Sequence, residues 1–231
     1  MNTLQSILFV APVLLFSVIA HEYAHGYAAL RQGDPTARQL GRLTWNPIKH
    51  IDPFMTILLP AMLWIASHGR VVLGGAKPVP VNPRNYREFR RGDIIVSLAG
   101  VTANLLLAFA CALAIVVVGV LGNAVTPLRT PAAVLQIMFE YGIWLNLLLI
   151  AFNLIPIPPL DGSHVLKHLL PAAWAVRYAA ISRYGIIVLV ALLYFGGSFF
   201  TFWMQPAMHL TDVLMRLVNP FMLSSAPAWA Q

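Results

Sequence analysis

Four long stretches of the chain carry almost no charge, and they limit the folds that it can adopt. They run from Leu4 to about Leu30, from Ile94 to Leu128, from Thr130 to Leu160 and from Tyr184 to Thr211. Each can supply a helix of about 20 residues, the length that crosses the hydrocarbon core of a bilayer. Only 10% of the 231 residues are charged and 59% are hydrophobic, whereas a soluble domain has about 25% charged residues. The sequence therefore predicts an all-α polytopic membrane protein.

A fifth apolar stretch, residues 53–69, is shorter and has Pro60 near its middle. Hydropathy leaves a complete span and a re-entrant segment both open here, so we expect four to five transmembrane helices. The segment at 208–218 has apolar residues at helical spacing with Asp212 and Arg216 opposite them. It suits either a helix in the membrane interface or a packed terminal helix.

The net charge of +7 follows a topological pattern. No run of Lys and Arg is dense enough, or interleaved with aromatic residues, to predict a nucleic-acid partner. Lys and Arg gather in the loops after the first stretch, before the second, and between the third and fourth, and only Arg129 and Arg216 lie elsewhere. If residues 53–69 form a re-entrant segment, these three loops lie on the same side of the membrane, and the positive-inside rule makes that side cytoplasmic. If residues 53–69 span the membrane completely, the difference in positive charge between the two sides is much weaker. We expect a multi-pass protein of the cell membrane, in contact with the lipid bilayer.

His21, Glu22 and His25 interrupt the first apolar stretch in the pattern H-E-x-x-H. On a helix, His21 and His25 lie one turn apart on the same face, where two imidazoles can hold one Zn²⁺. Glu22 is then placed to act as a general base toward water. A chance match is the alternative, but His and Glu are rare in membrane spans and usually functional there. The pattern therefore favours a metal site.

A catalytic zinc site needs a third protein ligand and keeps a fourth position open. Asp161 is the only carboxylate between Glu140 and Asp212, and it follows the proline-rich "NLIPIPPLDG" at the end of the third stretch. Prolines end a helix there. With the basic loops on one side, Asp161 and His25 both lie toward the cytoplasm. Asp161 is therefore the candidate third ligand.

These two motifs together resemble the site-2 protease family of intramembrane zinc metalloproteases. The segments "GDPTARQLGRLTWNPIKHIDP", "AKPVPVNP" and "SLAGVTANLLLA" are similar to its compact bacterial subgroup without PDZ or CBS domains. The resemblance runs from about Phe16 to Leu166. It implies one Zn²⁺ per chain held by His21, His25 and Asp161, with Glu22 activating water. It also implies that the substrates are single-span membrane proteins cut within the membrane.

The resemblance adds expectations about other parts of the chain. Asn104 in "AGVTANLL" is a candidate donor to the reaction's oxyanion, and a hydrogen bond between helices is the alternative. A short membrane-associated β-segment is implied before the second span, where "GGAKPVPVNP" fits an edge strand or a rigid loop. We expect one integral-membrane domain over 1–231, with a catalytic core at about 4–166 and C-terminal helices at about 181–218.

Three further histidines have weaker patterns. His164 and His168 are also four residues apart but lack a Glu after the first His, so they indicate a helix start more than a second metal site. His50 lies in a loop with Asp52, where a turn is a simpler interpretation than a gate.

Two functions of other classes stay open beside the protease. A cation transporter for zinc would also use intramembrane His and Asp side chains, although transporters usually spread such ligands along a path. A non-catalytic scaffold derived from a protease would typically have lost the Glu or a ligand, and this chain retains both.

Overall fold

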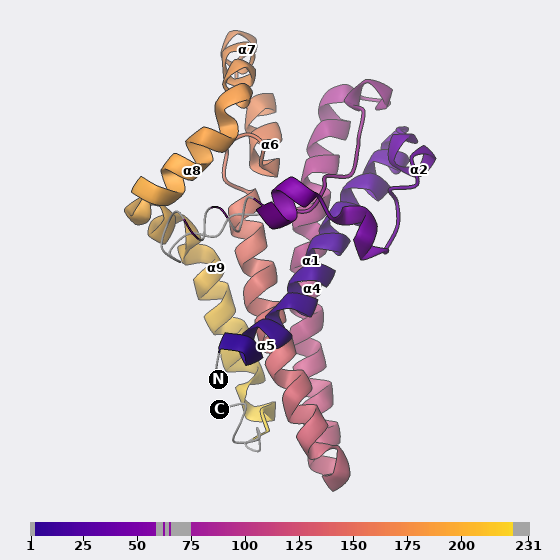
Figure 1. Ribbon diagram of the computed structural model, residues 1–231, viewed down its shortest axis with the longest axis vertical. Helices are drawn as coiled ribbons and strands as arrows, with labels where there is room; N and C mark the ends of the chain where they lie inside the picture. Colours follow the sequence, from indigo (N-terminus) through magenta and orange to yellow (C-terminus); the bar gives the residue numbers. More distant parts are fainter. Residues whose placement is uncertain (1–2, 59–61, 63–64, 66–74, 224–231) are drawn as a thin grey trace. The chain divides into compact units, whose positions relative to one another are not determined.

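The computed structural model describes residues 3–58, 62, 65 and 75–223, and its long elements are all helices (Figure 1). The longest are α1 (Thr3–Gln32), α4 (Phe89–Ala124), α5 (Arg129–Asn153) and α9 (Gly197–Val218). Shorter α-helices are α2 (Thr36–Gln39), α6 (Asp161–Leu169), α7 (Ala172–Ile181) and α8 (Gly185–Phe195). Short turns of other helical types are η1 (Pro47–His50), η2 (Pro53–Leu58), η3 (Pro83–Asn85), η4 (Thr126–Leu128), η5 (Ser182–Tyr184) and η6 (Asn219–Phe221).

Within the described residues, four segments are long and apolar enough to cross a membrane: Leu8–Gln32, Phe89–Ala124, Thr126–Asn153 and Ala172–Phe195. This confirms the prediction of a helical, multi-pass architecture. The described residues contain no strand, and the β-segment is not confirmed. Most of residues 59–74 lie outside the described part of the chain, so the choice between a full span and a re-entrant segment stays a prediction.

The predicted position of the last span was wrong. Gly196 leaves the helical conformation, with φ −93° and ψ 28°, and divides the stretch 184–211 between α8 and α9. The last apolar span therefore begins earlier, in the alanine-rich α7. Helix α4 continues through Ala124, within the predicted second stretch, and the first proline after it is Pro127.

The described chain divides into two compact units, which we treat separately. The first contains Met1–Ser17, Ala103–Ala151 and Met204–Gln231. In it, α4, α5 and α9 bury a common apolar cluster of Ala108, Ala112, Ile115, Ile143, Leu147, Leu214 and Val218. Gln136 on α5 donates to the carbonyls of Ile115 and Phe221 and accepts the Leu223 N–H. The segment 208–218 is therefore a packed terminal helix, which was one of the two predicted alternatives.

The second unit contains Val18–Thr102 and Phe152–Trp203. The second half of α1 and the first turns of α4 lie side by side in it, and Ala29 and Val96 are buried together (Figure 1). The fully buried Asp34, just after α1, accepts hydrogen bonds from the backbone of Thr36 and Asn82 and from the side chains of Thr36 and Asn85. These bonds tie the end of α1 to η3 and so fix the intervening loops.

Candidate metal centre

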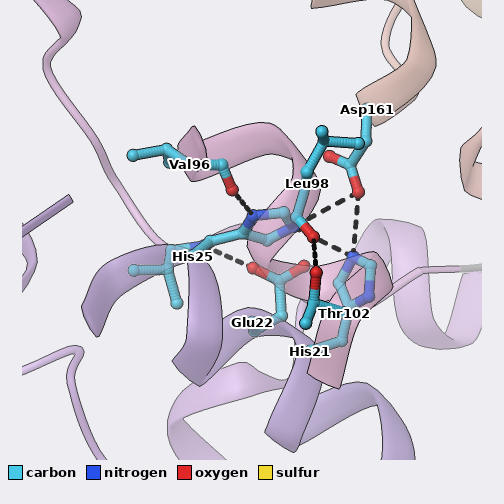
Figure 2. Close-up of polar contacts among 8 residues, drawn as sticks. His21, Glu22, His25, Val96, Leu98, Thr102 and Asp161 are labelled. Atoms are coloured by element: carbon cyan, nitrogen blue, oxygen red, sulfur yellow. Dashed lines mark hydrogen bonds and ion pairs between the residues drawn. The ribbon is translucent and has the colours of Figure 1, made fainter. Parts of the chain in front are cut away.

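Helix α1 presents His21, Glu22 and His25 on consecutive turns (Figure 2). The His25 Nδ1 lies 2.7 Å from the carbonyl oxygen of Val96 on α4. An imidazole that donates from Nδ1 to a carbonyl has its lone pair on Nε2, which is the arrangement of a metal-binding histidine with a supporting partner. The contact also fixes the rotation of the His25 ring.

Asp161 is the first residue of α6, and the chain reaches it through the turn that follows α5. Its Oδ2 lies 3.2 Å from the His21 Nε2 and 3.4 Å from the His25 Nε2. The two Nε2 atoms are 3.0 Å apart. Figure 2 shows the carboxylate and both imidazoles turned toward one another. The predicted ligand Asp161 is thus brought to the two predicted histidine ligands, which lie 136 and 140 residues before it in the chain.

The donor set fits a zinc ion. Ligand atoms held at about 2.0–2.1 Å in a tetrahedral site are about 3.3 Å apart, close to the three separations here. His21, His25 and Asp161 form the group of His, Cys, Asp and Glu side chains, within the described residues, that could hold a metal. Burial alone raises the pKa of the Asp161 carboxyl, but the two adjacent imidazoles outweigh it and hold that pKa well below its usual range. A carboxylate binds a metal in its ionised form, and a lowered pKa agrees with that requirement.

Gly100 on α4 makes room for the two histidines. A Cβ at this position would lie 2.5 Å from the His21 Cε1 and 2.6 Å from the Nε2 atoms of His21 and His25. No larger residue could stand there without moving the imidazoles. The sequence analysis missed this role, although a glycine inside a long apolar helix is a signal of close packing.

The Glu22 carboxylate lies beside the imidazoles but is not one of the three converging ligands (Figure 2). Its Oε2 accepts the backbone N–H of Val79 at 2.8 Å. Val79 belongs to the extended segment 75–82, and the sequence analysis did not foresee this contact. A glutamate held next to a metal site without ligating it is free to exchange protons.

Asn104 is fully buried on α4, and neither atom of its amide has a hydrogen-bond partner in the described part of the chain. The alternative of a hydrogen bond to another helix is therefore not observed there. Asn104 belongs to the first compact unit and the histidines to the second. Its role as an oxyanion donor stays a prediction.

Three further histidines, His50, His164 and His168, have other partners. The ring of His50 is buried and its Nε2 lies 2.9 Å from the Thr44 carbonyl, which fits the predicted turn. His164 and His168 on α6 approach the carboxylate of Asp93 instead, at 3.3 Å and 2.7 Å. His164 lies in the first turns of α6, which agrees with the predicted helix start, although the helix already begins at Asp161. The two histidines form an ion-pair cluster with Asp93.

An H-E-x-x-H helix completed by a distant carboxylate ligand defines a class of protein, the zinc metallopeptidases. The family model of peptidase family M50 matches residues 9–195. The chain belongs to this family, the site-2 protease family that the motifs resemble, and it is a zinc metalloprotease.

Curated relatives agree with this family. A Bacillus subtilis protein named "Putative zinc metalloprotease YwhC" is 40% identical over 179 residues, which cover 78% of this chain and 77% of the relative. Two proteins named "Putative zinc metalloprotease Rip2" are also similar. The Mycolicibacterium smegmatis protein is 33% identical, covering 78% of this chain and 64% of the relative. The Mycobacterium tuberculosis (strain Erdman) protein is 32% identical, covering 84% and 73%. No solved structure was found that matches the chain.

Proposed function

We propose that the protein is an intramembrane endopeptidase that hydrolyses peptide bonds within the transmembrane segments of single-span membrane proteins. The observation that carries this proposal is the position of the ligands. His21 and His25 lie inside the candidate span Leu8–Gln32 and meet Asp161 just beyond another span, Thr126–Asn153. A peptide bond would have to enter the depth of the bilayer to reach them.

His21, His25 and Asp161 would hold the zinc ion in this reaction. When bound, Zn²⁺ polarises the scissile carbonyl and makes water easier to deprotonate. Glu22 takes the proton from the attacking water and delivers it to the amine that leaves. His25 keeps its orientation through Val96, and Gly100 leaves space for both rings. The chain's own residues thus supply the ligands, the base and the room that the reaction needs.

We place the active site toward the cytoplasmic side of the cell membrane. The support is the distribution of Lys and Arg, because Arg31 lies in the last turn of α1, six residues after His25, and other basic residues follow in the next loops. Cysteine labelling in a Cys111→Ser background tests this placement. Positions 38 and 167 should label from the cytoplasm and position 129 from the opposite side; labelling of 38 and 129 from the same side contradicts it.

Comparative membrane proteomics tests the proposed reaction. Cells with the wild-type protein should contain fragments cut within a transmembrane segment, and cells with Glu22→Gln should lack them. Because Glu22→Gln retains the shape of the side chain and all three ligands, the comparison isolates proton transfer. Fragments that persist in Glu22→Gln cells contradict the proposal. Zinc uptake into proteoliposomes without any cleavage would instead support the transporter.

A further inference from the structure

The extended segment 75–82 places one backbone N–H directly on the catalytic glutamate. The N–H of Val79 donates to the Glu22 Oε2 at 2.8 Å, and Val79 is buried, with 5% of its surface exposed. A hydrogen bond from a backbone N–H to a carboxylate is charge-assisted and stronger than one between neutral groups. It restrains the carboxylate that the proposed reaction uses as a base.

The sequence around Val79 prepares this contact. Pro78 and Pro80 have no N–H and fix φ near −65°, so Val79 supplies the one donor of this tripeptide in an already restricted backbone. A Cβ at Gly26 would lie 2.9 Å from the Val79 Cγ1. The side chain of Val79 therefore packs against α1 one turn after Glu22, where only a glycine leaves that space.

Arg42 holds the other end of the same peptide group. Its Nη2 donates to the carbonyl of Lys77 at 2.9 Å and to that of Pro78 at 3.3 Å. The Pro78 carbonyl and the Val79 N–H belong to one planar peptide unit. Arg42 thus fixes the orientation of the unit that donates to Glu22, and a donor on its oxygen polarises its N–H.

The chain holds Arg42 itself in place. Gly41 has a positive φ of 61°. The N–H of Gly41 donates to the Arg38 carbonyl at 3.0 Å, and that of Arg42 donates to the Ala37 carbonyl at 2.8 Å. These are the two bonds of the Schellman motif that ends a helix with glycine. The end of α2 therefore points a guanidinium at the segment, and the backbone of His50 fixes Lys77 from another loop through a 2.8 Å hydrogen bond.

We propose that the Pro78–Val79 peptide group, oriented by Arg42, positions the Glu22 carboxylate for proton transfer. Arg42 is a positioning residue in this scheme, and it acts through the peptide. The inference rests on the proposed function, in which Glu22 is the base. Loss of the contact should lower kcat by about 10- to 100-fold, the effect of losing a hydrogen bond to a charged group. The KM and the zinc content should stay unchanged, because neither group touches a ligand.

The test is a double-mutant cycle measured on purified protein in proteoliposomes. Arg42→Gln and Val79→Pro are each combined with Glu22→Asp, whose shorter side chain withdraws from the Val79 N–H. Each single change should lower kcat, but neither should lower it further in the Glu22→Asp background. Arg42→Lys should recover part of the rate. Val81→Pro, two residues along the same segment, leaves the Glu22 contact intact and is the matched control.

A readout without catalysis completes the test. Hydrogen exchange at the Val79 amide should become faster in Glu22→Ala and in Arg42→Gln, with and without added zinc. Any of three results would overturn the inference. They are an equal loss of kcat in the wild-type and Glu22→Asp backgrounds, an unchanged rate of hydrogen exchange at the Val79 amide, and a loss of zinc in Arg42→Gln. If the Val79→Pro protein does not insert into the membrane, the double-mutant cycle of Arg42→Gln with Glu22→Asp tests the inference by itself.

The proposed function is tested separately in the same experiment. Wild-type protein is given both a single-span substrate and a soluble peptide. If the wild-type protein cleaves the soluble peptide but not the single-span substrate, the proposed intramembrane function is contradicted. The double-mutant cycle can then be measured with the soluble peptide, and it still tests the role of Arg42.

Discussion

Two pairs of histidines in this protein have the same spacing but different surroundings. His21 and His25 on α1 converge with one carboxylate oxygen of Asp161, their Nε2 atoms 3.0 Å apart. His164 and His168 on α6 also approach one carboxylate, that of Asp93. The comparison teaches that spacing of four residues brings two imidazoles to one face but does not by itself make a metal site.

The neighbours of each pair explain the difference. Lys167 lies 3.8 Å from the Asp93 carboxylate, so a permanent cation already occupies that side of the second cluster. Arg90 adds a second positive group through the carbonyl of His168. The first pair has a glutamate beside it and the glycine Gly100 in contact with both rings. The charges around the second cluster therefore disfavour a metal cation there, and the surroundings of the first pair favour one.

Removing one histidine from each pair gives the largest expected contrast. His25→Ala should reduce zinc from about one ion per chain to almost none and abolish cleavage, because a site with two protein ligands binds zinc weakly. His168→Ala should retain the zinc. Metal analysis of both purified variants measures this, and equal loss of zinc in the two would break the distinction between the pairs.

Adding a single methyl group beside the first pair should have the next largest effect. Gly100→Ala places a Cβ within 2.6 Å of both Nε2 atoms, so the rings must move apart. We expect zinc affinity to fall by about 10- to 100-fold, as for changes in groups that orient ligands. Titration against a competing chelator measures it. Gly75→Ala is the control, because a Cβ there has no atom of the described residues within 4 Å. An unchanged affinity in Gly100→Ala would contradict the close approach.

Sequence reasoning was strongest where a contact follows from helical spacing. It predicted His21, His25 and the membrane helices, and it found Asp161 because few carboxylates were available. It did not find Val79 or Gly100, since their roles come from segments that meet only when the chain folds. The last span was misplaced for a related reason: uniform hydropathy across Gly196 does not reveal where a helix stops.

The second pair should matter for stability more than for metal. Asp93 is buried, with 4% of its surface exposed, and its bonds hold α6 to the start of α4. Asp93→Asn should lower the free energy of unfolding by about 1–3 kcal/mol, since it weakens hydrogen bonds to charged groups. Zinc content at saturation should stay at the wild-type level. Denaturant unfolding and metal analysis on the same preparation measure the stability and the zinc content. Loss of zinc without loss of stability would contradict a structural role for the second pair.

Asp34 extends the comparison to a buried carboxylate without histidines, and its effect should be the smallest. Burial raises its pKa, but the bonds from Asn82, Thr36 and Asn85 outweigh burial and hold the pKa below its usual value. Its stabilisation is therefore complete above the unfolded pKa of about 3.9 and is lost as the pH falls through the lower folded pKa. The gap between the unfolding midpoints of wild type and Asp34→Asn should stay constant above about pH 5 and shrink as the pH falls below about 4; a gap that does not change on acidification would contradict this.

The most direct test of the account separates the base from the metal ligands. Zinc content and cleavage of a reconstituted single-span substrate are measured on the same preparations of wild type, Glu22→Gln and His25→Ala. Glu22→Gln should bind zinc as the wild type does and lose several orders of magnitude in cleavage rate, because an amide cannot accept the proton. His25→Ala should lose both together. A Glu22→Gln protein that cleaves at nearly the wild-type rate would contradict the account.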